Sequence, residues 1–218
     1  KERMNRLIEE KLYACPRLKH VIVNSRTTAL SIRREYGLPE ERLHVVYNGV
    51  DLERFSPESR MRARSEARQR FGFAEQDCVL LFLATNFRLK GIGPLLRALA
   101  RVRERDPSAP FRLLAAGQKR FARHAALAAS LGLSDRVAFH GHGHADDFYA
   151  AADALVHPTF HDPCANVCLE AMAAGLPAIT TLANGASELI RDGESGFVVP
   201  DALDVGATTI TREMEKAA

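Results

Sequence analysis

Two carboxylates, Asp162 and Glu170, stand eight positions apart across a predicted strand-to-helix turn. The apolar run 154–156 predicts a short buried strand, and the periodic segment 165–175 predicts a helix, so Asp162 falls in a loop and Glu170 in the helix. In an open parallel sheet, ligands bind at the carboxyl ends of strands and at helix N-termini. The pair therefore predicts a site for a sugar joined to a diphosphate, although acids near a helix start are also favoured for electrostatic reasons alone.

A basic residue followed by glycine, Lys90-Gly91, stands where the apolar run 78–84 is predicted to lead into a helix. This combination offers a point charge and backbone N–H groups to a phosphate, as the departure of a nucleotide diphosphate requires. We therefore assign Lys90 to the phosphate. Arg88 is a second donor-binding candidate. The structural alternative is that both cations cap an exposed turn.

Three histidines, His140, His142 and His144, alternate with Gly141 and Gly143. Alternation on an extended chain would point the three imidazoles in one direction, as a metal site requires. However, the spacing fixes no acidic or cysteine partner beside them. No metal is therefore predicted.

The composition is that of a globular α/β protein, with 46% hydrophobic and 26% charged residues. No apolar run approaches the roughly 20 residues of a spanning helix, and the first segment lacks the apolar core of a signal peptide. These features predict a cytoplasmic protein. The cysteines are scattered, and the spacing of Cys164 and Cys168 fits neither a redox motif nor a zinc site, so we expect reduced packing residues.

Positive charge is concentrated in the first third of the chain. Residues 1–70 contain 16 Lys and Arg against 10 Asp and Glu, whereas residues 71–218 contain 14 against 17. Acidic residues interleave with these arginines and no aromatic pattern accompanies them, so a solvated helix face is favoured and nucleic acid is not a predicted partner. Two further explanations of the positive charge stay open. It could attract an anionic acceptor, or it could hold the protein peripherally at the anionic inner face of the cytoplasmic membrane.

Strand-like runs alternate with helical stretches along the chain, which is the order of βαβ units. The runs begin near residues 21, 44, 78, 111, 136, 153, 177 and 196. The six runs from residue 78 onward predict one doubly wound parallel sheet. Its crossover helices are expected at about 91–104, 119–131, 146–151, 165–174 and 185–191. A helix rich in Arg and Ala precedes Phe71, and Asn48-Gly49 predicts a turn in a linker.

The stretch 157–200, HPTFHDPCANVCLEAMAAGLPAITTLANGASELIRDGESGFVVP, resembles the E-x7-E signature region of retaining glycosyltransferases of family 4, with Asp162 in place of the first Glu. The stretch 21–57 resembles the end of that family's N-terminal domain and the following hinge. The resemblance implies the GT-B fold of two facing Rossmann-like domains. Residues 1–57 would be the end of the acceptor domain and the linker, and residues 58–218 the donor-binding domain. The chain would then begin within a domain, lack most of the acceptor domain and be truncated at its C-terminus.

The resemblance also implies roles for individual residues. Lys90 matches the lysine of the family's donor-phosphate site, and the family's retaining mechanism would make it an electrostatic catalyst rather than a base. The arginine that usually stands upstream of this lysine is replaced by other residues. Asp162 would hold the sugar and Glu170 would accept the ribose hydroxyls, which suits carboxylates. The loop at residues 140–143 would meet the nucleotide base, mostly through its main chain. A tight turn would explain Gly117 as well as a donor contact would. The predicted donor-binding residues are Arg88, Gly117, His140, Gly141, His142, Gly143, Ala165, Asn166 and Val167.

The resemblance is strongest to bacterial enzymes of cell-envelope and lipopolysaccharide core assembly. It implies transfer of a hexose with retention to a glycan or glycolipid acceptor bound by the other domain. A UDP-hexose is the favoured donor, and GDP- and ADP-sugars stay open because recognition of the base through the main chain leaves little trace in the side chains. No metal and no other cofactor are expected. Two alternatives stay open: a nucleotide-sugar binding domain without activity of its own or with degenerate catalysis, and a GT-B relative of another reaction type such as an epimerase.

Overall fold

The computed structural model describes residues 2–202 of the chain. The chain divides into two compact units, Lys1–Gly49 and Val50–Ala218. The division follows Asn48-Gly49, where the sequence predicts a turn in a linker.

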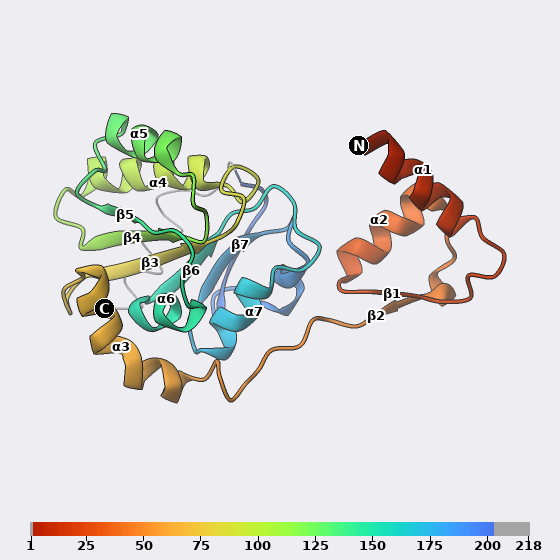
Figure 1. Cartoon of the computed structure of the whole chain (residues 1–218), viewed down its shortest axis with the longest axis horizontal. Coiled ribbons are helices and arrows are strands. Elements are labelled where there is room, and N and C mark those ends of the chain that lie inside the picture. Colours follow the sequence, from red (N-terminus) through yellow and green to blue (C-terminus); the bar gives the residue numbers. More distant parts are fainter. Residues whose placement is uncertain (1, 203–218) are drawn as a thin grey trace. The chain divides into compact units, whose positions relative to one another are not determined.

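The first unit is a small α/β element (Figure 1). Its strands β1 (Val21–Val23) and β2 (Leu43–Val45) pair in parallel, at the two positions where the sequence predicts strands. They are joined through α2 (Arg26–Tyr36) and the 3₁₀ segment η1 (Glu40–Arg42), and α1 (Glu2–Tyr13) precedes them. Ser25 caps α2 by accepting a hydrogen bond from the Thr28 amide, and Gly37 ends it in the left-handed conformation.

The second unit is built on a six-stranded parallel sheet with the order β5-β4-β3-β6-β7-β8. Its strands are β3 (Cys78–Leu83), β4 (Phe111–Ala116), β5 (Val137–Phe139), β6 (Ala154–His157), β7 (Ala178–Thr181) and β8 (Gly196–Val199). All six coincide with the predicted strand-like runs. This order is that of a doubly wound, Rossmann-like sheet, so the predicted fold class is confirmed.

Helices cover both faces of this sheet (Figure 1). Helices α4 (Ile92–Arg105) and α5 (Ala122–Ser130) lie on one face, and α6 (Ala145–Ala151) and α7 (Asn166–Ala173) on the other. Helix α3 (Pro57–Phe71) packs along α6. The last predicted crossover helix is instead a 3₁₀ segment, η2 (Gly185–Leu189). Asn184 starts η2 by accepting from the Ala186 amide, and the Ile190 amide closes it on the Ser187 carbonyl.

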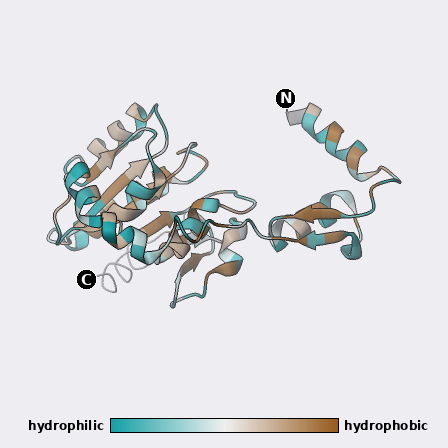
Figure 2. Ribbon diagram, turned by 60° about the horizontal axis from the view of Figure 1, so that its bottom comes forward, coloured by the Kyte–Doolittle hydropathy of each residue, from teal (hydrophilic) through white to brown (hydrophobic). Residues whose placement is uncertain are grey.

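The strands of the large sheet are the hydrophobic centre of this unit (Figure 2). Every residue of β3 is buried, and Leu80, Leu81 and Phe82 have no exposed surface. A parallel sheet covered on both faces requires such continuous apolar strands. The strand order reverses between β3 and β6: the next strands after β3, which are β4 and β5, lie on one side of it, and the strands that follow β6 lie on the other. In this fold class, ligands bind in the crevice at the carboxyl ends of the two strands where the order reverses.

The charge pattern of α3 predicts a solvated helix, but one stripe of its arginines contacts other segments of the unit. Arg60, Arg64 and Arg68 recur every four residues and turn toward the rest of the unit. Arg68 is 1% exposed and donates to one carboxylate oxygen of Asp153 at 2.6 Å, while Arg64 donates to the other at 2.5 Å. Arg68 also donates to the carbonyls of residues 74, 75 and 77. A guanidinium has five donors, so it satisfies oxygens that an apolar side chain would leave unpaired. For this stripe the solvated interpretation is wrong.

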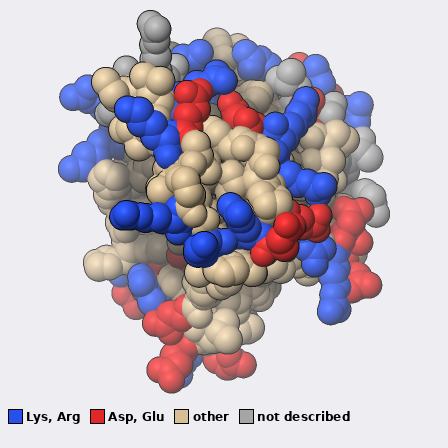
Figure 3. Space-filling view, turned by 90° about the vertical axis from the view of Figure 1, so that its right-hand side faces the viewer, with Lys and Arg blue, Asp and Glu red and all other residues tan. Residues whose placement is uncertain are grey.

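Charged side chains of both signs share the surface. Figure 3 shows Lys and Arg interspersed with Asp and Glu over the face in view. Within residues 2–202, the helices are all too short or too polar to cross a bilayer.

Candidate functional site

A cleft of about 320 Å³ opens at the carboxyl ends of β3 and β6. Its walls come from the segments that follow β3, β4, β5 and β6 and from the first turn of α7. Eight predicted site residues line it: Lys90, Gly117, His142, Gly143, Asp162, Ala165, Asn166 and Val167. The other lining residues are Leu83, Ala84, Thr85, Ala145, Phe148 and His157.

Lys90 and Asp162 form an ion pair in this cleft. The Lys90 ammonium donates to Asp162 Oδ2 at 2.6 Å and to the carbonyl of His161 at 3.1 Å. Their side chains are 18% and 15% exposed. Asp162 Oδ1 accepts a hydrogen bond from the Cys164 amide. Burial by itself would raise the pKa of Asp162, but the neighbouring His157 and Lys90 lower it to about 2. Asp162 is therefore ionised at neutral pH.

Gly91 lets the two loops that carry this pair approach each other. It begins α4 with a φ of +85°, and a Cβ at this position would lie 1.9 Å from the Pro158 carbonyl oxygen. The Phe160 amide donates to the Leu89 carbonyl at 3.0 Å, which joins the same two loops. A residue with a side chain would push them apart.

His157, the last residue of β6, lies in the cleft wall, although the sequence pattern predicts no role for it. Its side chain is 2% exposed, and within the described chain both ring nitrogens are buried without a hydrogen-bond partner. Nε2 lies 3.7 Å from Asp162 Oδ2, and the ring stacks on Phe82 at 6.2 Å between centroids. Burial lowers the pKa of His157, which keeps the imidazole neutral.

Gly117 follows β4 and lies close to Ala84 in the cleft wall. Its φ is +100°, and a Cβ there would lie 2.7 Å from the Ala84 carbonyl oxygen. The Gly117 amide donates to the Gly141 carbonyl at 2.9 Å, which ties the turn to the histidine-rich loop. Gly117 therefore both forms a tight turn and lines the cleft.

The histidine-rich loop divides between the cleft and the protein body. His142 and Gly143 line the cleft, whereas His140 packs edge-on against Phe71 and Phe148 and lies outside the lining, as does Gly141. Over residues 2–202, no three His, Cys, Asp or Glu side chains gather closely enough to hold a metal.

The first turn of α7 faces the cleft through Asn166 and Val167. No side chain of the described chain caps it at Ala165, whose amide donates to Oδ1 of the fully buried Asn184 at 3.0 Å. The Asn184 amide group also donates to Cys168 Sγ and Thr180 Oγ1. Asn184 therefore fixes the start of α7 from within the core, a role that its position in a predicted loop does not signal.

Glu170 and Arg88 lie outside the lining of this cleft. Glu170 accepts a hydrogen bond from the Tyr149 hydroxyl at 2.7 Å. Burial and the Glu170 charge raise the pKa of Tyr149, so this hydroxyl stays a donor. Arg88 lines a separate surface cavity of about 470 Å³ with Asn86, Leu89 and Phe160.

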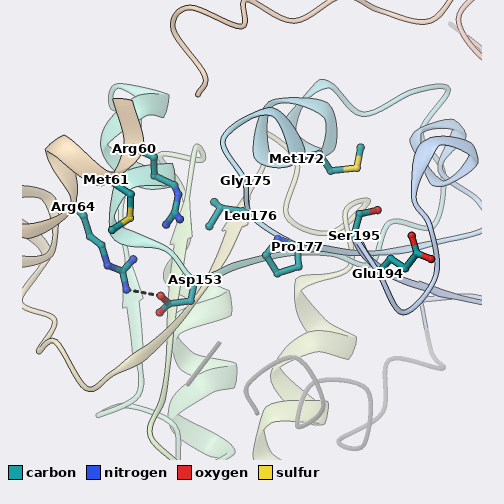
Figure 4. A pocket seen from close by; sticks show the side chains of 10 residues that line it. All are labelled: Arg60, Met61, Arg64, Asp153, Met172, Gly175, Leu176, Pro177, Glu194 and Ser195. Atoms are coloured by element: carbon teal, nitrogen blue, oxygen red, sulfur yellow. Dashed lines mark hydrogen bonds and ion pairs between the residues drawn. The ribbon is translucent and has the colours of Figure 1, made fainter. Parts of the chain in front are cut away.

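A larger cavity, of about 560 Å³, lies at the opposite end of the strands, where their amino ends are (Figure 4). It borders the amino ends of β6, β7 and β8 through Asp153, Pro177 and Ser195. Its cations Arg60 and Arg64 reach from α3 toward Asp153 and are engaged in holding that helix. The cleft at the carboxyl ends is therefore the better candidate for chemistry.

Comparisons with known proteins agree with this geometry. The family profile "Glycosyl transferases group 1" matches residues 77–213, and "Glycosyltransferase Family 4" matches residues 1–54. The D-inositol 3-phosphate glycosyltransferase of Salinispora arenicola is 35% identical over 88% of this chain and 46% of that protein.

Two solved structures combine a similar fold with a related sequence. WaaG, a glycosyltransferase involved in lipopolysaccharide biosynthesis, has a TM-score of 0.79 and 28% identity, covering 89% of this chain and 53% of that one. HepE of Anabaena in complex with UDP-glucose has a TM-score of 0.76 and 26% identity, covering 91% and 54%. The chain spans about half the length of the relatives it matches.

Proposed function

Because this chain belongs to the group 1 glycosyl transferases and has the fold of one half of a GT-B enzyme, we propose that it supplies the nucleotide-sugar donor site of a retaining hexosyltransferase. The observation that carries the proposal is the Lys90–Asp162 pair beside the first turn of α7. A cation and backbone N–H groups suit a diphosphate, and a carboxylate suits sugar hydroxyls.

In the proposed complex, the diphosphate lies against Lys90 and the amides at the start of α7. Asp162 holds hydroxyls of the sugar, and the base meets the His142–Gly143 part of the histidine-rich loop. Glu170 lies in the second turn of α7, and Tyr149 occupies one oxygen of its carboxylate. We assign the ribose hydroxyls to the other oxygen.

The proposed reaction breaks the bond between the sugar's anomeric carbon and the diphosphate oxygen, and forms a bond to an acceptor hydroxyl on the same face. Negative charge grows on the leaving diphosphate, and the Lys90 ammonium stabilises that charge without accepting a proton. An oxygen of the departing phosphate takes the proton from the acceptor hydroxyl. No metal is assigned to these steps.

The comparisons support a UDP-hexose donor, since HepE was solved with UDP-glucose. For the acceptor we propose a cell-envelope glycan or glycolipid, in line with the role of WaaG in lipopolysaccharide biosynthesis. A phosphorylated inositol is the second candidate, because the relative at 35% identity is named for that acceptor. Either acceptor would be bound mainly by the other half of the enzyme.

Calorimetric titration of the chain with UDP, GDP and ADP, and with UDP-glucose and GDP-mannose, at two salt concentrations tests the donor site. We expect UDP and UDP-glucose to bind selectively and with modest salt dependence. Binding of single-stranded nucleic acid with a steep salt dependence, together with no response to any nucleotide, would contradict the proposal. Donor binding without transfer by the full-length protein would favour a nucleotide-sugar binding domain instead.

A further inference from the structure

The proposed donor complex asks Lys90 and Asp162 to bind different parts of the donor, yet these residues bind each other here. The Lys90 ammonium donates to Asp162 Oδ2 at 2.6 Å, and the Cys164 amide donates to Asp162 Oδ1. A diphosphate that attracts Lys90 would take away the main partner of Oδ2. A half-buried carboxylate that loses a charged partner needs another donor to keep its charge and its orientation.

His157 is placed to provide that donor. Its Nε2 lies 3.7 Å from the same oxygen, which is less than 1 Å beyond hydrogen-bond distance. The ring stacks on Phe82, with 6.2 Å between the centroids. No other described histidine comes within ion-pair distance of this carboxylate.

A packing role alone does not account for a histidine at this position. Both ring nitrogens are buried without a partner among the described residues, which costs free energy that an apolar ring of similar size would avoid. The imidazole also belongs to a residue that lines the cleft, which a donor would fill. An unpartnered donor beside a carboxylate indicates a contact that forms in another state of the site.

We propose that His157 is a positioning residue, whose Nε2–H replaces the Lys90 ammonium at Asp162 Oδ2 when the donor's diphosphate draws Lys90 away. This inference rests on the proposed function. The exchange moves no proton between residues: Lys90 stays charged on the phosphate, and Asp162 stays charged toward the sugar. A neutral imidazole suits this role because it donates without placing a second positive charge beside Lys90.

The two variants His157→Gln and His157→Phe separate positioning from packing. The Gln side chain keeps a donor near Nε2, whereas Phe keeps the stacked ring without a donor. We measure the affinities of UDP and UDP-glucose for each variant of the chain by calorimetry at pH 7.5. Because His157 acts through the residue that holds the sugar, His157→Phe should lower the affinity for UDP-glucose relative to UDP by about tenfold. His157→Gln should keep most of the wild-type ratio.

The outcomes distinguish the inference from the proposed function. If His157→Phe leaves the ratio of UDP-glucose affinity to UDP affinity unchanged, whether both affinities fall equally or neither falls, the positioning role is overturned. Failure of the folded wild-type chain to bind either nucleotide would instead contradict the proposed donor site, on which the inference rests.

Imidazole resonances give a second readout that does not depend on affinity. In ¹⁵N-histidine-labelled chain, the His157 Nε2 proton should shift downfield when UDP-glucose is added, as the bond to Asp162 forms. Asp162→Ala should abolish this shift, and the buried His124, which lies outside the cleft lining, serves as reference. A His157 signal that stays unchanged while UDP-glucose binds would overturn the exchange.

Discussion

Lys90 Nζ lies 2.6 Å from Asp162 Oδ2, so an ion pair joins the loops that follow the neighbouring strands β3 and β6. The two residues are 72 positions apart in the chain. The sheet order brings them together, and the close approach at Gly91 brings their loops within reach. The proposed roles of Lys90 and Asp162 in donor binding therefore both depend on this junction.

Lys90→Met should weaken UDP binding by about tenfold or more, because a charge-assisted hydrogen bond to the phosphate contributes about 1.5–3 kcal/mol. The matched control is Lys119→Met, which removes the same charge from an exposed residue two positions after Gly117 and outside the cleft lining. Calorimetry with UDP measures both. Equal affinities in Lys90→Met and wild type would remove Lys90 from the phosphate site.

Glu170→Gln should weaken UDP binding, because an amide accepts the ribose hydroxyls less strongly than a carboxylate does. Tyr149→Phe removes the hydroxyl that holds Glu170 at 2.7 Å and should have a smaller effect in the same direction. Exposed Glu104 on α4 offers the control Glu104→Gln, for which we expect no change. If the affinity for UDP is the same in all three variants, the ribose lies elsewhere.

Gly117→Ala should reduce both stability and UDP affinity, because its Cβ would lie 2.7 Å from the Ala84 carbonyl oxygen at the cleft wall. Gly132 also has a positive φ, but no described atom lies within 4 Å of its added Cβ. Gly132→Ala should therefore cost about 1 kcal/mol of unfolding free energy from backbone strain alone. We expect Gly117→Ala to cost about 3 kcal/mol, since strain and a clash combine. Equal costs in urea denaturation would contradict the close approach.

The pKa of Asp162 predicts a loss of stability in acid. It is lowered to about 2 from an ordinary value of 3.8, so the folded state favours the charged carboxylate. Its contribution of about 2 kcal/mol is present above pH 3.8 and is lost as the pH falls through about 2. In urea denaturation, the difference in unfolding free energy between wild type and Asp162→Asn should shrink across this window. A difference that is constant with pH would contradict the lowered pKa.

Arg68→Met should cost about 3–5 kcal/mol of unfolding free energy, because it leaves the partly buried Asp153 without one of its charged partners. Exposed Arg62 on the same helix provides the control, and Arg62→Met should change stability by less than about 0.5 kcal/mol. Thermal and urea denaturation compare the two. Similar small effects would show that α3 is not held by its arginine stripe.

The sequence predicted the strands because strand formation leaves a local pattern. Runs such as 78–83 and 111–116 are continuously apolar, as a sheet covered on both faces requires, and the alternation with helices implies the parallel order. Lys90 and Asp162 could be assigned to one edge of the sheet for the same reason, since both follow predicted strands.

The features that were missed depend on contacts between distant segments. His157 is buried and stacks on Phe82 of β3, a contact with a distant segment that the pattern around residue 157 does not encode. The Arg60–Arg64–Arg68 stripe has the pattern of a solvated face, but carbonyls and Asp153 from other segments satisfy these cations. Polar groups with distant partners are therefore where local patterns mislead.

The central position of β3 has a consequence for the chain as it leaves the ribosome. β3 pairs with β4, the next strand in the sequence, but its other edge pairs with β6, where Leu80 meets Ala154. A nascent chain that ends before β6 would hold the βαβ unit of β3, α4 and β4 with one open edge of β3, the kind of edge that recruits other chains. Because β6 borders the cleft, a translation product truncated before β6 would lack the cleft and would be prone to aggregate without binding any ligand.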